Sequence, residues 1–247
     1  MFYSANDLLK YTIRADDMSA EAEDIFLDTR DLKLRHVAVD VGPWFSNRTA
    51  VVSAERFRAP DTGSRDWPAD LTRAEAEAAP GLDTMRADSD DGTSLPFYPA
   101  WPPVIVGVAG ETISPLLMQA QLADHLEEGD SADPKATSEG RGELKSLTGL
   151  MGLPVFGPEG QLAKLVDLLI EPDDMTVQHM VIDTGSRLPQ RQMVVPAGVI
   201  RHFPKHGEHL VVDLTERQLE NSPPLEEVTR IDRNWIDKTL AYYGLNL

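Results

Sequence analysis

The hydrophobic residues of this chain fall into short runs separated by Gly, Pro and Asp, and the pattern is clearest between residues 154 and 223. Four such runs follow one another there, at residues 165–170, 177–182, 193–195 and 210–212. Short runs rich in Val, Ile and Leu, with turn residues between them, predict β-strands. The turn Gly157-Pro158-Glu159-Gly160 leads into the first run. We therefore expect this part of the chain to form a small antiparallel barrel or sandwich.

A short helix is predicted directly after the last run. Thr215 and Gln218 have the spacing of a capping box, in which the Thr oxygen accepts from a backbone N–H and the Gln side chain reaches back. Thr72 and Glu75 have the same spacing near residue 70. A proline follows in each case, at positions 80 and 223, and proline cannot continue a helix.

The chain contains this whole pattern twice. A shift of 143 positions aligns residues 11–80 with residues 154–223 without a gap, and 16 of the 70 positions are identical. The identical pairs include Asp24 and Asp167, Asp40 and Asp183, and Gly42 and Gly185. Self-similarity at one offset indicates a single structural unit used twice. We expect the two repeats to have the same strand order.

The first repeat departs from the second in two places. Its first turn is Arg14-Ala15-Asp16-Asp17, which contains no glycine. Pro68 occupies the position of Val211, inside the last predicted strand, and proline in a sheet is confined to edges and bulges. We expect repeat 1 to be the more irregular copy.

These repeats define the predicted domains. Repeat 1 covers residues 1–80 and repeat 2 covers residues 144–228. An acidic linker rich in Pro and aromatic residues, 81–143, joins them and contains a predicted helix at about residues 115–128, because Ser114 and Pro115 are typical of a helix start. Residues 229–247 are expected to form a C-terminal helix.

The net charge of the chain limits the classes of partner that it can bind. A net charge of −18 argues against nucleic acid, whose phosphates require a basic surface, and against anionic membrane surfaces. Residues 81–140 carry 11 acidic and 2 basic residues, so half of the net charge lies in the linker. This linker is either a solvated connection or an acidic docking surface for a basic partner.

Cysteine is absent, which removes disulfides, thiol nucleophiles and thiolate metal ligands. No stretch approaches the roughly 20 apolar residues that span a bilayer. The N-terminal residues lack the basic and apolar regions of a signal peptide. We therefore expect a soluble, cytoplasmic protein.

Several motifs together resemble the PRC-barrel family, which includes the cytoplasmic part of the photosynthetic reaction-centre H subunit and a domain of a ribosome maturation factor. The similarity is closest to bacterial proteins with two such barrels in tandem, and it covers both repeats, about 150 residues, and the opening Met1-Phe2-Tyr3-Ser4-Ala5. In repeat 2 the motifs are Asp167-Leu168-Leu169-Ile170, His179-Met180-Val181-Ile182-Asp183-Thr184-Gly185, Met193-Val194-Val195-Pro196 and Leu214-Thr215-Glu216-Arg217-Gln218-Leu219-Glu220-Asn221-Ser222-Pro223.

The resemblance implies two small barrels of the six-stranded type that act as interaction modules. It implies no catalytic residues. The missing glycine turn of repeat 1 and the length of the acidic linker are its two departures from the family pattern.

Three groups of residues could carry chemistry. His202, His206 and His209 lie close enough in sequence to ligate zinc or nickel, or they belong to a solvated hairpin loop. His36 and His179 are equivalent in the two repeats, and each is either a pH-sensitive contact or a packed, hydrogen-bonded ring.

The third group is Asp40 with Arg48, and Asp183 with Arg191, at the same spacing of eight residues. Such pairs can bind an anion or transfer a proton. Each Asp precedes a turn with Gly42 or Gly185, where Asp normally bonds its own backbone, so we interpret each Arg as a strut across that turn.

These features favour a non-catalytic scaffold that binds a protein partner or a second copy of itself, most simply as a homodimer. The exposed apolar residues that would make the contact are Trp44, Phe45, Tyr98, Trp101, Leu116 and Leu117. The alternative is a metal- or small-molecule-binding stress protein that uses the loop from His202 to His209 or a groove between the barrels. No catalytic signature is present in the sequence, so we expect no enzyme and no cofactor.

Overall fold

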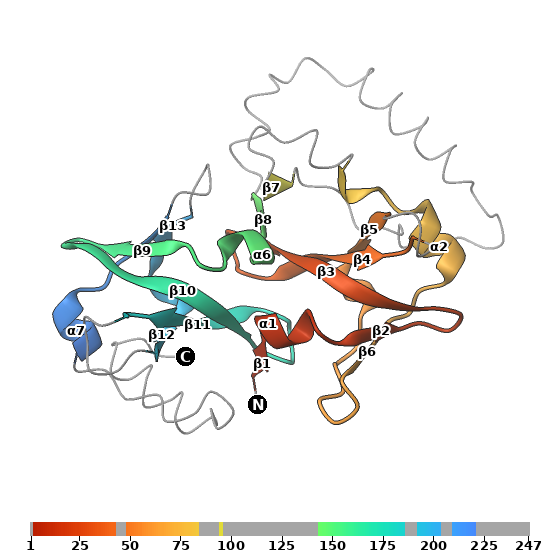
Figure 1. Cartoon of the computed structure of the whole chain (residues 1–247), viewed down its shortest axis with the longest axis horizontal. Coiled ribbons are helices and arrows are strands. Elements are labelled where there is room, and N and C mark those ends of the chain that lie inside the picture. Colours follow the sequence, from red (N-terminus) through yellow and green to blue (C-terminus); the bar gives the residue numbers. More distant parts are fainter. Residues whose placement is uncertain are drawn as a thin grey trace, which may run out of the picture.

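The computed structural model describes residues 2–42, 48–83, 94–95, 143–185, 192–203 and 209–220. In these residues the chain is mainly β, as predicted, and its strands form two sheets of seven strands each. The sheets lie side by side, one built chiefly from each repeat (Figure 1). Nearly all of the predicted linker, with its helix at 115–128, and the predicted C-terminal helix lie outside the described residues.

Repeat 2 supplies six strands in the order β12-β11-β10-β9-β14-β13. They are β9 (Pro154–Gly157), β10 (Gly160–Ile170), β11 (Val177–Asp183), β12 (Gln192–Pro196), β13 (Ile200–His202) and β14 (Leu210–Val212). The four apolar runs of the sequence therefore fall on strands, as predicted. Gly160 begins β10 with a φ of +124°, a backbone conformation that only glycine adopts without strain.

Repeat 1 supplies five strands in the order β5-β4-β3-β2-β6. They are β2 (Thr12–Arg14), β3 (Ser19–Asp28), β4 (Leu34–Asp40), β5 (Thr49–Ser53) and β6 (Asp66–Pro68). Pro68 ends a strand at the edge of the sheet, as predicted. The equivalent of β13 is reduced to an isolated bridge between Phe57 and Ala69, because Pro68 has no N–H with which to continue the ladder.

Each sheet contains one parallel pair, which the prediction of an antiparallel fold missed. β14 pairs in parallel with β9, and β6 pairs in parallel with β2. The short 3₁₀ helix η2 (Ala197–Val199) carries the chain from β12 to β13 without reversing it, so β14 runs in the direction of β9. Strand pairing among the described residues leaves both sheets open, so closure into barrels is not shown.

The two repeats have equivalent strand pairings. Asp24 follows a β-bulge and lies opposite Ala38, and Asp167, 143 positions later, follows a bulge and lies opposite Val181. Among the described strands the gapless alignment is wrong for the first one, because Ile13 corresponds to Val155, 142 positions later. Ile13 lies between Ala20 and Trp67, and Val155 lies between Ala163 and Leu210. The one-residue difference is accommodated in the first hairpin, where repeat 1 lacks the glycine turn.

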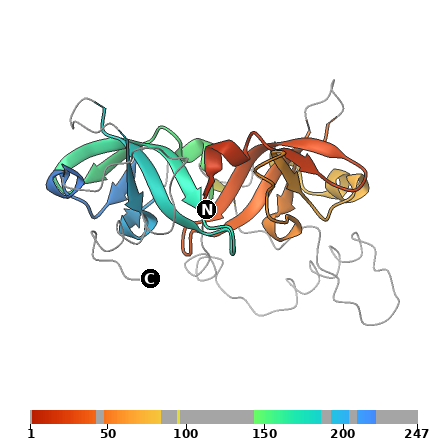
Figure 2. The ribbon, with the colours of Figure 1, turned by 90° about the horizontal axis from the view of Figure 1, so that it is seen from below.

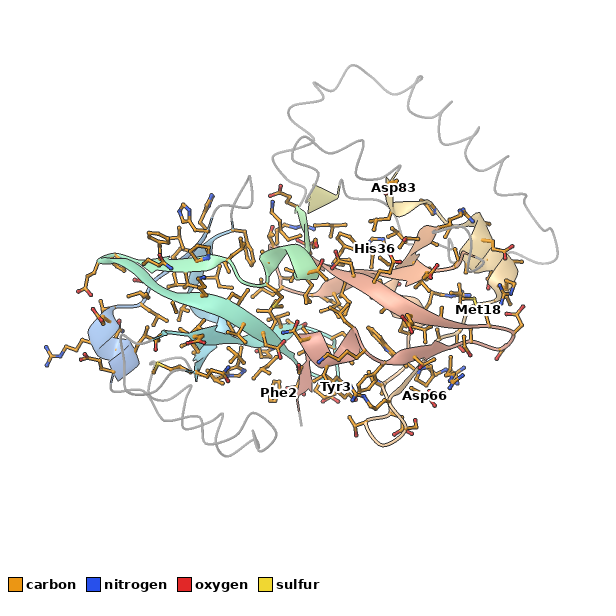
Figure 3. The ribbon with its side chains drawn as sticks, viewed as in Figure 1. Phe2, Tyr3, Met18, His36, Asp66 and Asp83 are labelled. Atoms are coloured by element: carbon orange, nitrogen blue, oxygen red, sulfur yellow. The ribbon has the colours of Figure 1, made fainter. Side chains whose placement is uncertain are left out.

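The first segments of the two repeats are exchanged between the sheets. The first segment, called arm 1, contains β1 (Tyr3–Ser4) and α1 (Ala5–Leu8) and pairs with β10 of repeat 2. Arm 2 contains β8 (Leu144–Ser146) and α6 (Leu147–Leu150) and pairs with β3 of repeat 1. Figure 2 shows the N-terminus between the two halves, and Figure 3 shows Phe2 and Tyr3 near the middle of the long axis of the molecule. The pairing therefore crosses the predicted domain boundary at residue 144.

The exchange joins the repeats into one hydrophobic core. A single buried cluster contains Trp67 of repeat 1, Leu210 of repeat 2, and Leu8 and Leu150 of the arms. A smaller cluster on the sheet of repeat 1 contains Phe26, Ala38 and Val51 with Leu82 and Leu144. Arm 2, which supplies Leu144, therefore also covers part of that sheet. The other described elements are β7 (Ser94–Leu95), which pairs with β8, η1 (Ala54–Arg56), α2 (Arg73–Ala78) and α7 (Glu216–Glu220). None of the helices in the described ranges is long and apolar enough to cross a membrane.

Candidate functional site

The contacts between repeat and arm centre on a buried carboxylate at each bulge. Asp24 is 2% exposed, and the bulge in β3 turns its side chain toward arm 2. Its Oδ2 accepts the hydroxyl protons of Ser146 at 2.5 Å and Thr148 at 2.8 Å, and its Oδ1 accepts the backbone N–H of Thr148 at 3.0 Å. Three donors from one short segment therefore converge on a carboxylate inside the core.

Asp167 makes the corresponding contacts with arm 1. Its Oδ2 accepts the hydroxyl proton of Ser4 at 2.5 Å, and its Oδ1 accepts the backbone N–H of Asn6 at 3.0 Å. Asn6 also donates from its side chain to the carbonyl of Val166 at 2.7 Å. Burial raises the pKa of Asp167 although these hydrogen bonds act in the opposite direction.

Each arm serine has two roles. The oxygen of Ser4 also accepts the backbone N–H of Asp7 at 3.1 Å and so caps α1. The oxygen of Ser146 accepts the backbone N–H of Gly149 at 2.9 Å and caps α6 in the same way. The hydroxyl therefore fixes the start of the helix and joins it to the carboxylate of the other half.

A third contact joins the two repeats directly. Lys33 lies opposite Thr176, which is its own equivalent 143 positions later. Two backbone hydrogen bonds flank the pair, from Leu34 N–H to Met175 O at 3.0 Å and from Val177 N–H to Leu32 O at 2.9 Å. These two bonds are also equivalent to each other, so a pseudo-twofold axis passes between Lys33 and Thr176.

The loops at this axis have the same backbone in both repeats. Leu32 and Met175 have φ values of 58° and 57°, a left-handed conformation that costs about 1 kcal/mol or more for residues other than glycine. Asp31 accepts the backbone N–H of Lys33 at 3.1 Å, and Asp174 accepts that of Thr176 at 3.0 Å. These Asp side chains support turns that would otherwise be strained.

His36 and His179 are both buried, with exposures of 3% and 1%. The packed ring predicted for them is confirmed, but the predicted hydrogen bonds are wrong, because no described residue bonds to either nitrogen of either ring. Burial lowers the pKa of each to about 4, and for His36 the adjacent Arg35 adds to the effect. Phe2, directly before arm 1, packs edge-on against His179 with ring centroids 5.4 Å apart. Figure 3 shows His36 on the sheet of repeat 1.

The predicted Asp turns are confirmed, and the predicted Arg48 strut is wrong. Asp40 accepts the N–H of Gly42 at 2.9 Å, and Asp183 accepts that of Gly185 at 2.7 Å. The Arg48 side chain instead donates to the carbonyls of Glu77 and Ala79, the latter at 3.2 Å. The last carbonyls of α2 lack partners within the helix and attract a cation. The Arg48 guanidinium therefore binds these carbonyls and does not bridge the turn. Arg191 lies outside the described residues.

Both predicted capping boxes are confirmed. Thr72 Oγ1 accepts the N–H of Glu75 at 3.3 Å, and Glu75 accepts the N–H of Thr72 at 2.8 Å. Thr215 Oγ1 accepts the N–H of Gln218 at 3.3 Å, and Gln218 accepts the N–H of Thr215 at 2.9 Å. These threonines therefore stabilise the first turns of α2 and α7.

The histidines proposed as metal ligands do not form a described site. His202 is exposed at the end of β13, whereas His209 packs against Phe156 with ring centroids 4.9 Å apart. His206 lies outside the described residues. Within the described ranges no group of three or more His, Asp and Glu side chains is arranged to hold a metal ion.

The residues predicted to bind a partner, Trp44, Phe45, Tyr98, Trp101, Leu116 and Leu117, all lie outside the described residues. An open groove of about 370 Å³ runs along β10, and its lining includes Gln161, Lys164, Val166, Asp183 and Gly185. Asp183 and Gly185 are the only predicted site residues in this lining.

The residues that the sequence pattern missed are Asp24, Asp167 and the arm serines. Both Asp residues were visible in the sequence as an identical pair. Asp24 directly precedes an apolar run in repeat 1, and Asp167 interrupts the corresponding run in repeat 2. A carboxylate at such a position needs partners when it is buried, and this was the available signal. The partners could not be found from the offset, because Ser4 and Ser146 lie before the aligned stretch.

No protein-family model matches the chain, and none of the curated proteins matches it. The resemblance to PRC-barrel proteins therefore stays a prediction.

Proposed function

We propose that the protein is a non-catalytic interaction scaffold of the tandem PRC-barrel kind, which binds a protein partner or a second copy of itself in the cytoplasm. One observation carries this proposal. The Asp, Thr and Arg side chains that are identical in both repeats and are described make structural hydrogen bonds or ion pairs, and the identical His36 and His179 are packed in the core.

These contacts are of four kinds. Asp24 and Asp167 hold the arms, and Asp31, Asp40, Asp174 and Asp183 stabilise turns. Thr72 and Thr215 cap helices. Arg58 and Arg201 pair with Asp70 and Asp213, the second pair at 2.5 Å. Residues that both copies retain for folding support a structural role for the repeat, with binding assigned to the segments in which the copies differ.

The binding surface that we propose comprises the aromatic and apolar residues of the loop after Gly42 and of the linker. Trp44 with Phe45, and Tyr98 with Trp101, are the anchors, since aromatic residues dominate the energetics of protein interfaces. The acidic linker favours a basic partner, and steering by opposite charge would make the association sensitive to salt.

The test is affinity capture from native lysate with the intact protein as bait. A specific partner should be retained by the wild-type chain and lost by the variants Trp44→Ala with Phe45→Ala, or Tyr98→Ala with Trp101→Ala. The matched control is Phe57→Ala, an aromatic in the described part of repeat 1 that packs against Trp67 at 4.9 Å. Equal capture by all of these proteins would contradict the proposed surface.

Self-association is tested separately by light scattering. A homodimer would have twice the chain mass of 27.3 kDa at micromolar concentration. Replacing Leu116 and Leu117 by Glu should then give a folded monomer, because carboxylates without partners are not tolerated in an apolar interface. A mass near 27.3 kDa for the wild-type chain would reject the dimer.

A further inference from the structure

The interface between the two repeats is self-complementary. Ser146 binds Asp24 as Ser4 binds Asp167, with 2.5 Å between the oxygens in both cases. At the pseudo-twofold axis Lys33 faces its own equivalent, Thr176. An interface in which each surface carries both halves of every contact is the arrangement of an isologous dimer.

Each half of the molecule presents one arm and one acceptor to the other half. Arm 1 delivers the Ser4 hydroxyl and the Asn6 N–H to Asp167, and arm 2 delivers the Ser146 hydroxyl and the Thr148 N–H to Asp24. All of these contacts join repeat 1 to repeat 2. They would form equally well if the two repeats belonged to different chains.

The length of the connection permits that exchange. Leu95 and Glu143 are the described residues on either side of the linker. The chain between them, fully extended, would span roughly 150 Å. Its length does not oblige a repeat to pair with the other repeat of its own chain.

We infer that the partner this interface fits is a second copy of the chain, with repeat 1 of one copy pairing with repeat 2 of the other through the same arms. The inference rests on the proposed function because it makes a second copy one of the partners. Pairing within one chain is favoured by an effective concentration on the order of millimolar, so the exchanged dimer forms when chains refold together at high concentration.

Disulfide trapping tests this in the full chain, which contains no cysteine. Lys33 and Thr176 form a pair without mutual hydrogen bonds, a geometry in which the Cα atoms lie about 4.5 Å apart and a disulfide can close. The double variant Lys33→Cys, Thr176→Cys, refolded dilute, should close a disulfide within one chain and remain a monomer. The single variants Lys33→Cys and Thr176→Cys, unfolded, mixed and refolded together at high concentration, should give a species of twice the chain mass linked between positions 33 and 176.

Replacing Lys33→Cys by Asp16→Cys in the mixture is the matched control, because Asp16 is exposed and precedes β3, whereas Lys33 follows the other end of that ten-residue strand. This mixture should give no linked dimer. Two results would overturn the inference: failure of the double variant to close its disulfide, or a mixture that stays monomeric at every concentration while the double variant closes. If the mixture stays monomeric and the aromatic residues still capture a partner from lysate, this inference fails and the proposed function stands.

Discussion

Ser146 donates its hydroxyl proton to the buried carboxylate of Asp24 at 2.5 Å, although 122 residues separate the two along the chain. The contact recurs between Ser4 and Asp167 across 163 residues. Both bonds run between the halves of the molecule, so the strands of each repeat are completed by a segment from the other. The two halves are therefore expected to unfold together.

Loss of one anchoring carboxylate should destabilise the whole molecule. Asp24→Ala removes the acceptor for Ser146 and Thr148, and it leaves the hydroxyl of buried Ser146 without this acceptor inside the core. We expect a loss of about 3 kcal/mol in the free energy of unfolding, measured from urea melts.

Asp40→Ala is the matched control for this substitution, because Asp40 is exposed and its side chain accepts the N–H of Gly42 within its own turn. We expect it to cost about 0.5 kcal/mol. Melts in which the two substitutions cost the same would contradict the role of the buried anchor. Separate transitions for the two halves of the wild-type chain would contradict the joint core.

The buried histidines should make the protein sensitive to mild acid. Their pKa is about 4 in the folded chain and 6.5 in the unfolded chain. As the pH falls below 6.5 the unfolded state takes up protons that the folded state cannot, so stability falls until about pH 4. Each histidine accounts for about 3 kcal/mol over this window.

The double variant His36→Leu, His179→Leu should flatten this dependence, and exposed His202→Leu should leave it unchanged. Asp167 acts with the opposite sign: its raised pKa stabilises the folded state at low pH, and that contribution is lost as the pH rises through its folded value. The measurement is the urea midpoint between pH 7 and pH 4. A wild-type curve as flat as that of the double variant would rule out the histidines as the cause.

Both capping threonines should contribute equally to stability. Thr72→Ala and Thr215→Ala each remove a side-chain acceptor for a backbone N–H in the first turn of a helix. We expect each to cost about 1 kcal/mol in denaturant melts. Thr72→Ser and Thr215→Ser keep the acceptor and should cost much less. Neutral effects of both alanine substitutions would remove the capping argument.

Zinc should not stabilise the protein. His202 is exposed, and His209 is packed against Phe156. A ligand that binds only the folded state raises the melting temperature with its concentration, so a zinc titration followed by thermal melts detects a site. A rise that is abolished by His202→Ala or His209→Ala would favour the alternative function as a metal-binding protein.

Local patterns in the sequence determined the individual elements. Apolar runs, the Gly157 to Gly160 turn and two capping boxes placed strands, a hairpin and helix starts at the observed positions. The 143-residue offset identified the duplication and the equivalence of Asp24 with Asp167. The strands, the hairpin and the helix starts depend on residues a few positions apart, whose backbone preferences act without the rest of the fold.

The tertiary structure alone decided how the elements combine. The sequence does not show that the arms exchange, because strand pairing depends on which edges meet in space and two short arms fit either sheet by pattern alone. It also does not show that Arg48 caps α2, since its partners lie 29 and 31 residues away. A long charged side chain such as that of Arg48 binds the strongest acceptors that it can reach. Only the folded backbone determines which acceptors those are.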